Sequence, residues 1–116
     1  MFCKIIAGKI PSSKIYEDEW VLGIEDINPL APIHCLVLPK KHVRCLNDLK
    51  LDNGNGADAT LLAKMLAGIQ QIAADKGVRS KGYRTIINTE KEGGQTVFHL
   101  HAHILAGEQL GVDIRP

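Results

Sequence analysis

The sequence has no long apolar run and almost no net charge. None of its apolar segments approaches the length of a membrane span, and Met1 is not followed by a basic and then apolar leader, so we expect neither a membrane anchor nor a secretory signal. The formal net charge of +1 gives no positive field that would attract a polyanion. The composition therefore argues against nucleic acid as a partner.

Cysteine is scarce, and two phosphate-handling motifs are missing. Cys3, Cys35 and Cys45 form an odd set without a disulfide framework, which fits a cytoplasmic protein in a reducing compartment. There is no Gly-x-x-x-x-Gly-Lys loop, and no cluster of acidic residues resembles a two-metal phosphoryl-transfer site. If the chain handles a phosphate, imidazoles and backbone N–H groups must neutralise the charge, and we expect no cofactor.

The remaining composition is that of a soluble globule. With 116 residues, 45% of them apolar, we expect a single domain over residues 1–116 with one core. An apolar stripe over Leu61–Ala73 predicts one long helix, with Asp58 or Thr60 able to cap its start and Gly77 placed to end it. We also expect a helical turn over residues 2–7 and a loop over residues 52–56. Four short strands are expected over residues 14–16, 21–25, 34–38 and 83–88. This order predicts an α+β fold with an antiparallel sheet.

The most informative pattern is His99, His101 and His103, which alternate with apolar residues. In a strand, alternate side chains share one face, so the imidazoles would lie on one side and Phe98, Leu100, Ala102 and Ile104 on the core side. In a helix, His101 would lie roughly 200° round from His99, and the grouping would be lost. The pattern therefore predicts a strand.

Three interpretations of the imidazole row are open. It is a solvated strand face, a metal site, or a nucleophilic centre in which the middle imidazole attacks and its neighbours orient it and meet the charge of the substrate. A metal is hard to reconcile with the spacing, because the Cα atoms of His99 and His103 would lie about 13 Å apart in a strand. Imidazole suits nucleophilic attack because much of it is neutral near pH 7.

The residues before the histidines favour the nucleophilic interpretation. Gly93 and Gly94 allow close backbone approach and expose N–H groups that suit a phosphate, and Gln95 and Thr96 add polar side chains. The pair alone is equally typical of a plain turn. Followed by the three histidines, it predicts a phosphate cradle that leads into a catalytic strand.

The segment Gly93–Leu105 resembles the signature of the histidine-triad superfamily, in which three histidines alternate with apolar residues. Further similarity lies in the segments 2–6, 10–11, 25–34, 39–42 and 82–84 and at Asn88, so the resemblance covers nearly the whole chain. It is greatest to the histidine-triad nucleotide-binding proteins that act as purine nucleoside phosphoramidases. This resemblance implies a sheet of five antiparallel strands, a short N-terminal helix and a homodimer that joins two such sheets.

The resemblance also implies roles for individual residues. His101 would attack the α-phosphorus of an adenosine 5′-phosphoramidate, supported by His99, His103, Thr96 and His34. Asp26 would accept hydrogen bonds from the ribose hydroxyls. The other residues expected around the purine nucleotide are Phe2, Ile5, Ile24, Ile27, Asn88, Gly94 and Gln95.

The implied reaction has two steps: a nucleotidyl group is transferred to His101, and water then releases AMP. Two alternatives remain. A dinucleoside polyphosphate hydrolase would share the triad and the covalent intermediate, and a nucleotide-binding signalling module would show little turnover.

Some bacterial members of the superfamily hold a structural zinc ion with a Cys-x-x-Cys pair and histidines. This chain offers Cys3 for the second position of that pair and nothing for the first. We therefore expect a free buried thiol and no metal. The chain also departs from the resemblance at Ala106-Gly107-Glu108 and in its tail, Leu110–Pro116, so the preferred leaving group cannot be inferred from it.

Overall fold

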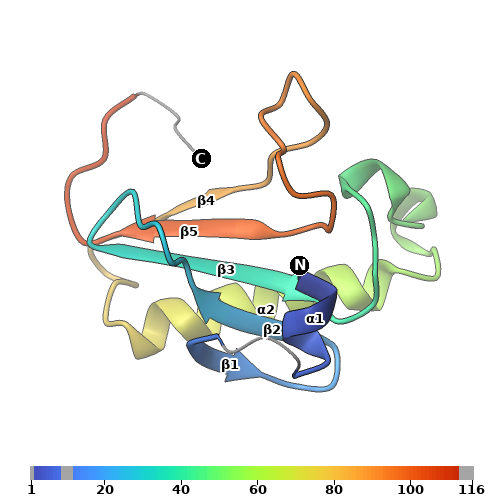
Figure 1. The fold of residues 1–116 in the computed structure, drawn as a ribbon, viewed down its shortest axis with the longest axis horizontal. Coiled ribbons are helices and arrows are strands. Elements are labelled where there is room, and N and C mark those ends of the chain that lie inside the picture. The colour runs from blue at the N-terminus through green and yellow to red at the C-terminus, as the bar shows by residue number, and fades with distance from the viewer. Residues whose placement is uncertain (1, 9–11, 113–116) are drawn as a thin grey trace.

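A computed structural model of the chain describes residues 2–8 and 12–112. The resembling pair Ile10-Pro11 and the last four residues of the tail lie outside the described residues. One sheet dominates the structure (Figure 1), with the strands in the order β1-β2-β3-β5-β4 and every neighbouring pair antiparallel. The strands are β1 (Lys14–Glu17), β2 (Val21–Glu25), β3 (Ile33–Pro39), β4 (Arg84–Ile86) and β5 (Ala102–Ala106). The expected α+β fold with five antiparallel strands is confirmed.

Two α-helices accompany the sheet. The first, α1 (Phe2–Ile6), agrees with the helical turn expected at the N-terminus, and the second, α2 (Ala59–Asp75), contains the whole apolar stripe. Two short 3₁₀ turns lie between β3 and α2, at Leu46–Asp48 and Asp52–Gly54. No helix in the described part of the chain is both long and apolar enough to cross a membrane.

Of the two helix-end signals expected for α2, the structure confirms the glycine at the C-terminal end and not the side-chain cap at the N-terminal end. Asp58 occupies the N-cap position, but its carboxylate does not cap the helix: it accepts hydrogen bonds from Lys41 Nζ and the Lys50 N–H, both at 2.8 Å. The expected side-chain cap is therefore wrong, because two donors from the preceding loops have taken this carboxylate.

Gly77 ends α2 as expected. It adopts a left-handed conformation with φ of 73°, and its N–H donates to the Ala74 carbonyl at 3.1 Å. The N–H of Val78 reaches back to the Ala73 carbonyl at 3.0 Å. These two bonds form a Schellman motif, which satisfies carbonyls that the end of a helix leaves free.

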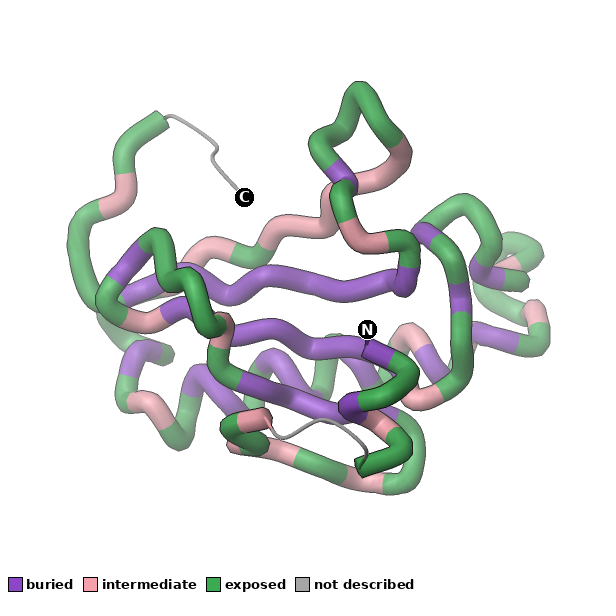
Figure 2. The backbone as a smooth tube through the Cα atoms, viewed as in Figure 1, coloured by how far each residue is buried: buried purple, intermediate pink, exposed green. Residues whose placement is uncertain are grey.

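Alternation along β2 and β3 gives the sheet two apolar faces. Val21 and Val37 belong to the core that α2 covers, together with Met65 and Ile72. The residues one position along face the other side, where Leu22, Ile24, Leu36 and Leu38 pack with Phe2 and Ile5 of α1. Figure 2 shows that both central strands are buried along most of their length. The sheet thus separates a large core from a smaller layer under α1.

The histidine segment is only partly a strand. β5 begins at Ala102, so His103 lies in the strand while His99 and His101 precede it. Leu100, Ala102 and Ile104 enter the core as expected. Phe98 does not: it is 41% exposed and lies under the Arg44 guanidinium, 4.5 Å from its ring centroid. The expected position of Phe98 is wrong because the chain bends at residues 97–99 before it joins the sheet.

Candidate active site

A cavity of about 610 Å³ opens on the α1 side of the sheet. Its apolar wall comes from α1 and the central strands, and includes Phe2, Ile5, Ile24 and Leu36. Its polar wall comes from the β2–β3 connection, the start of β3, β5 and the loop before it, and includes Asp26, His34, Asn88, Thr96 and His103. Ile27 and Gly94 also line the cavity, whereas Gln95, His99 and His101 do not.

The ring of His101 is oriented by the backbone beside it. Its Nδ1 lies 2.8 Å from the His99 carbonyl oxygen, and since a carbonyl only accepts, Nδ1 carries the proton and donates. In the neutral ring Nε2 then holds a free lone pair. His101 packs edge-on against Phe2 and His103, with ring centroids 5.1 and 5.0 Å away, and both of these neighbours line the cavity.

His34 and His103 form a hydrogen-bonded pair whose proton positions follow from the backbone. The Leu30 N–H donates to His34 Nδ1 at 3.0 Å, so the neutral His34 ring carries its proton on Nε2. That Nε2–H donates to His103 Nδ1 at 3.0 Å, with Asp26 Oδ2 also within 3.4 Å. His103 therefore keeps its own proton on Nε2. This chain of hydrogen bonds from the Leu30 N–H through His34 to His103, called the His34 relay below, fixes the His103 tautomer and leaves its Nε2–H as a donor.

Burial keeps these imidazoles neutral. It lowers the pKa of His103 to about 4, with the His101 and His34 rings acting in the same direction and the Asp26 carboxylate opposing them. Burial also lowers the pKa of His101, against its hydrogen bond to the His99 carbonyl, and the pKa of His34, against the charge of Asp26. Neutral rings at pH 7 are what a lone-pair nucleophile and a fixed relay require.

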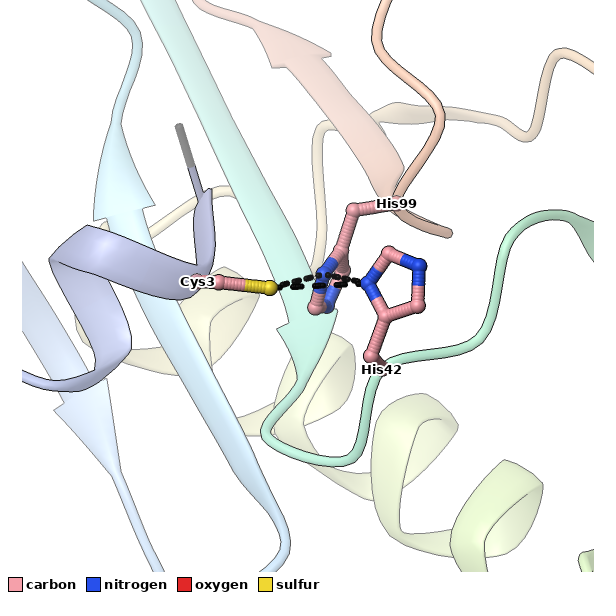
Figure 3. A group of neighbouring side chains, drawn as sticks. All are labelled: Cys3, His42 and His99. Atoms are coloured by element: carbon pink, nitrogen blue, oxygen red, sulfur yellow. Dashed lines mark hydrogen bonds between the residues drawn. The ribbon is translucent and has the colours of Figure 1, made fainter.

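His99, the first of the three histidines, contacts a different set of groups. Its Nε2–H donates to the Pro39 carbonyl at 2.8 Å, which leaves Nδ1 as an acceptor. This Nδ1 lies 3.1 Å from His42 Nδ1 and 3.6 Å from Cys3 Sγ, and Cys3 Sγ lies 3.5 Å from His42 (Figure 3). The thiol of Cys3 is exposed, so the expected buried thiol is wrong.

The Cys3–His42–His99 cluster has the chemistry of a zinc site. One thiol and two imidazole nitrogens converge, and thiolate and imidazole are the ligands that zinc prefers. The bond from His99 to Pro39 resembles the carbonyl contact that commonly orients a metal-binding histidine. These residues fit the zinc site that the sequence resemblance implies better than expected: Cys3 stands at the second position of the cysteine pair, and His42 and His99 supply imidazole nitrogens.

The glycine loop contributes less to an anion cradle than its sequence predicts. The N–H of Gly94 already donates to the Lys91 carbonyl, and that of Gln95 to the Glu90 carbonyl, both at 3.0 Å. The Gln95 side chain is buried and bonded to backbone: Oε1 accepts the Glu90 N–H at 2.9 Å, and Nε2 donates to the Arg44 carbonyl at 2.8 Å. Gln95 therefore holds the loop in shape, and Thr96 brings the next side chain into the cavity.

Leu36 is a cavity residue that the sequence analysis did not single out. Its signal was present, because residues 34 and 36 share a face of β3 by alternation, and Leu36 pairs in register with Ile24. Ser12, Leu30 and Val97 also line the cavity. They lie in turns or irregular segments, where periodicity gives no guide to side-chain direction.

Comparison with known proteins agrees with this geometry. Residues 7–110 match the family described as the HIT domain. An uncharacterized HIT-like protein of Chlamydia muridarum is 44% identical over 96% of this chain and 83% of that protein. A purine nucleoside phosphoramidase of Escherichia coli K12 is 38% identical over 96% of this chain and 89% of that protein.

Solved structures show the same fold. A HIT family hydrolase from Legionella pneumophila superposes with a TM-score of 0.89 at 40% identity, over 97% of this chain and 96% of that one. A histidine triad protein from Clostridium difficile superposes with a TM-score of 0.87 at 46% identity, over 97% and 94% of the two chains. Together with the alternating imidazoles beside the cavity, these matches show that the chain belongs to the HIT-domain family.

Proposed function

We propose that this chain is a hydrolase that cleaves purine nucleoside 5′-phosphoramidates by way of a covalent nucleotidyl group on His101. The observation that carries the proposal is the 2.8 Å bond from His101 Nδ1 to the His99 carbonyl, which leaves Nε2 as the nucleophilic atom. The HIT-domain match and the phosphoramidase name of the 38% identical relative support a hydrolase of this kind.

In the first step, His101 Nε2 attacks the α-phosphorus and the P–N bond to the leaving amine breaks. The imidazole gains positive charge as the new P–N bond forms, and the His99 carbonyl stabilises the Nδ1–H of that cation. The departing amine needs a proton. Solvent supplies it, because neutral His103 cannot lose its Nε2–H without becoming an imidazolate; that N–H instead donates a hydrogen bond to a phosphate oxygen.

In the second step, water attacks the same phosphorus and the bond to His101 Nε2 breaks. The proton of the attacking water passes to solvent, so AMP leaves and the His101 ring returns to its neutral state. The His34 relay keeps His103 Nδ1 occupied as an acceptor throughout, so that its Nε2–H remains a donor to the phosphate. The Thr96 hydroxyl lies at the cavity wall and would donate to a phosphate oxygen.

The nucleoside is positioned by the rest of the cavity. Asp26 lies at the wall with a side chain that is 18% exposed, and one of its oxygens accepts the Asn28 N–H at 2.8 Å. A carboxylate accepts several hydrogen bonds, so it can also take both ribose hydroxyls. Phe2, Ile5 and Ile24 provide an apolar surface for the base, and Ile27, which is 85% exposed, lies at the rim.

A metal would have a structural role in this scheme. If zinc binds, Cys3, His42 and His99 would hold it, and it would fix α1 against the segment before β5 while supplying no reacting group.

The test is turnover of adenosine 5′-phosphoramidate and of a diadenosine polyphosphate by the same preparation, with AMP release followed for each. We expect much faster release from the phosphoramidate. Faster cleavage of the dinucleotide would make the chain a dinucleoside polyphosphate hydrolase. Tight AMP binding without turnover of either compound would indicate a binding module.

A further inference from the structure

Ser12 carries an unusual feature for a residue beside a ligand cavity. Among the residues that the structure describes, its hydroxyl oxygen is the one buried side-chain N or O atom without a hydrogen-bond partner. A buried hydroxyl without a partner costs about 1–3 kcal/mol of stability, so such groups are rare unless something else satisfies them.

The position of Ser12 indicates what kind of partner satisfies its hydroxyl. The residue lines the cavity and lies just before β1. Its neighbour Ser13 accepts a hydrogen bond from the Glu25 N–H at 3.0 Å, which holds this segment beside the end of β2, next to Asp26. The serine therefore lies on the Asp26 side of the cavity, which Phe2, Ile5 and Ile24 also line.

We propose that Ser12 is a specificity-determining residue whose hydroxyl hydrogen-bonds an edge of the nucleobase. The inference rests on the proposed nucleotide function. In that function Asp26 takes the ribose and the imidazoles take the phosphate, which leaves the base edge as the polar part of the ligand without an assigned partner. A hydroxyl both donates and accepts, so it suits the ring nitrogens and exocyclic groups of a purine.

The ligand-free position of the hydroxyl is compatible with this role. Its oxygen is shut off from solvent in the present rotamer, while the residue as a whole is partly exposed. Rotation about the Cα–Cβ bond carries a serine oxygen between three staggered positions. A base edge in the cavity would therefore gain a partner that the free protein leaves unsatisfied.

This reasoning gives Ser12→Ala two effects of opposite sign. Removing the unsatisfied hydroxyl should raise the melting temperature of the ligand-free protein by a few degrees. The same change should weaken AMP binding by about three- to tenfold, the usual effect of one neutral hydrogen bond. A serine with a purely structural role would not raise stability and lower affinity together.

The experiment measures melting temperature without ligand, and dissociation constants for AMP, GMP, CMP and purine riboside 5′-monophosphate, which lacks exocyclic groups. We expect the loss of affinity in Ser12→Ala to differ between bases. Ser80→Ala is the matched control, since Ser80 is exposed and does not line the cavity. It should change neither quantity.

Three results would overturn the assignment: unchanged affinity in Ser12→Ala, an equal loss for all four nucleotides, or a lower melting temperature. The equal loss would place the hydroxyl on the sugar or phosphate. If the unmutated protein binds none of the four nucleotides, the proposed function itself is wrong, which is distinct from the failure of Ser12 alone.

Discussion

A single backbone contact decides the chemistry of His101. Because the His99 carbonyl holds Nδ1–H, removing the ring removes the only nitrogen that this arrangement aims as a nucleophile. We expect His101→Asn to lower turnover of adenosine 5′-phosphoramidate by at least about a thousandfold. AMP binding, measured by calorimetry, should persist because Asp26 and the apolar wall are intact.

The control for His101 is Ser80→Ala, which changes an exposed side chain that does not line the cavity. That variant should keep most of the turnover. Comparable rates in His101→Asn and the unmutated protein would show that another group attacks the phosphorus.

Asp26 should determine the preference for ribose. Its carboxylate loses one partner when the sugar is 2′-deoxy, and a charge-assisted bond is worth on the order of 1.5–3 kcal/mol. We expect AMP to bind about tenfold or more tightly than dAMP, and Asp26→Ala to abolish most of that difference. Asp75→Ala is the control, because the Asp75 carboxylate is exposed, does not line the cavity and accepts a hydrogen bond from Gln71 at 2.9 Å. Equal binding of AMP and dAMP by the unmutated protein would contradict the assignment.

The buried imidazoles should make the fold sensitive to acid. His103 has an ordinary pKa of 6.5 that burial lowers to about 4, so between these pH values the unfolded chain binds a proton that the folded chain does not. Stability therefore falls as pH decreases through this window, and is unaffected by His103 above about pH 6.5. The shift corresponds to an upper bound of roughly 3 kcal/mol at pH 4.

Urea unfolding at pH 7, 5 and 4 tests this dependence. His103→Gln should reduce the loss of stability on acidification, while His34, His99 and His101 maintain part of it, since burial lowers their pKa values as well. Ser80→Ala, at an exposed position without a titratable group, should leave the dependence unchanged. If the free energy of unfolding depends on pH identically in His103→Gln and in the unmutated protein, His103 is charged in the folded state at acid pH.

At the scale of structural elements, the glycine that ends α2 can be tested by substitution. A side chain at Gly77 would meet no atom within 4 Å, so the cost of Gly77→Ala comes from its φ of 73° alone. We expect a loss of about 1 kcal/mol in the free energy of unfolding. Gly111→Ala is a matched control, because that position is equally open and has no left-handed φ. Equal stabilities of the two variants would contradict the Schellman end of the helix.

The elements that could be predicted from sequence are those with a clear period. β2 follows from a short run rich in apolar and branched residues between turns, and α2 follows from a helical apolar stripe that one face of a helix buries. Asp58 shows what local rules miss: it has the residue type and place of a cap, yet tertiary contacts with Lys41 and Lys50 take its carboxylate.

Alternation predicts side-chain direction only where site residues lie on strands, whereas Asp26, Asn88 and Thr96, in irregular segments, were predicted through the family resemblance. His34 and Leu36 share a face of β3, and His103 lies in β5. His42 and Ser12 were missed because they lie in irregular segments, where neither period nor spacing fixes direction. Gln95 lies in the glycine loop as expected, but its side-chain amide hydrogen-bonds backbone groups of residues 44 and 90. That role depends on tertiary contacts between distant segments, which periodicity and spacing do not predict.

At the scale of the whole molecule, the sheet has an edge that invites association. β4 pairs only with β5, so its other side is an edge of the sheet in the described structure. On α2, Leu66 is 49% exposed. A small domain buries only about two-thirds of its unfolded surface alone, and an open edge strand is a template for pairing. By resemblance to the family's two-fold arrangement, we expect a homodimer with Tyr83–Asn88 and Leu61–Ile72 at its contact.

Light scattering at micromolar concentration should then give about twice the chain mass of 12.7 kDa. Thr85→Lys places a charge at an exposed position of β4, and should shift the mass toward one chain without unfolding the protein, because edge lysines oppose strand pairing. Asn47→Lys, at an exposed position in the Leu46–Asp48 turn, is a control that should remain dimeric. An active protein that is monomeric throughout would show that one chain completes the site by itself.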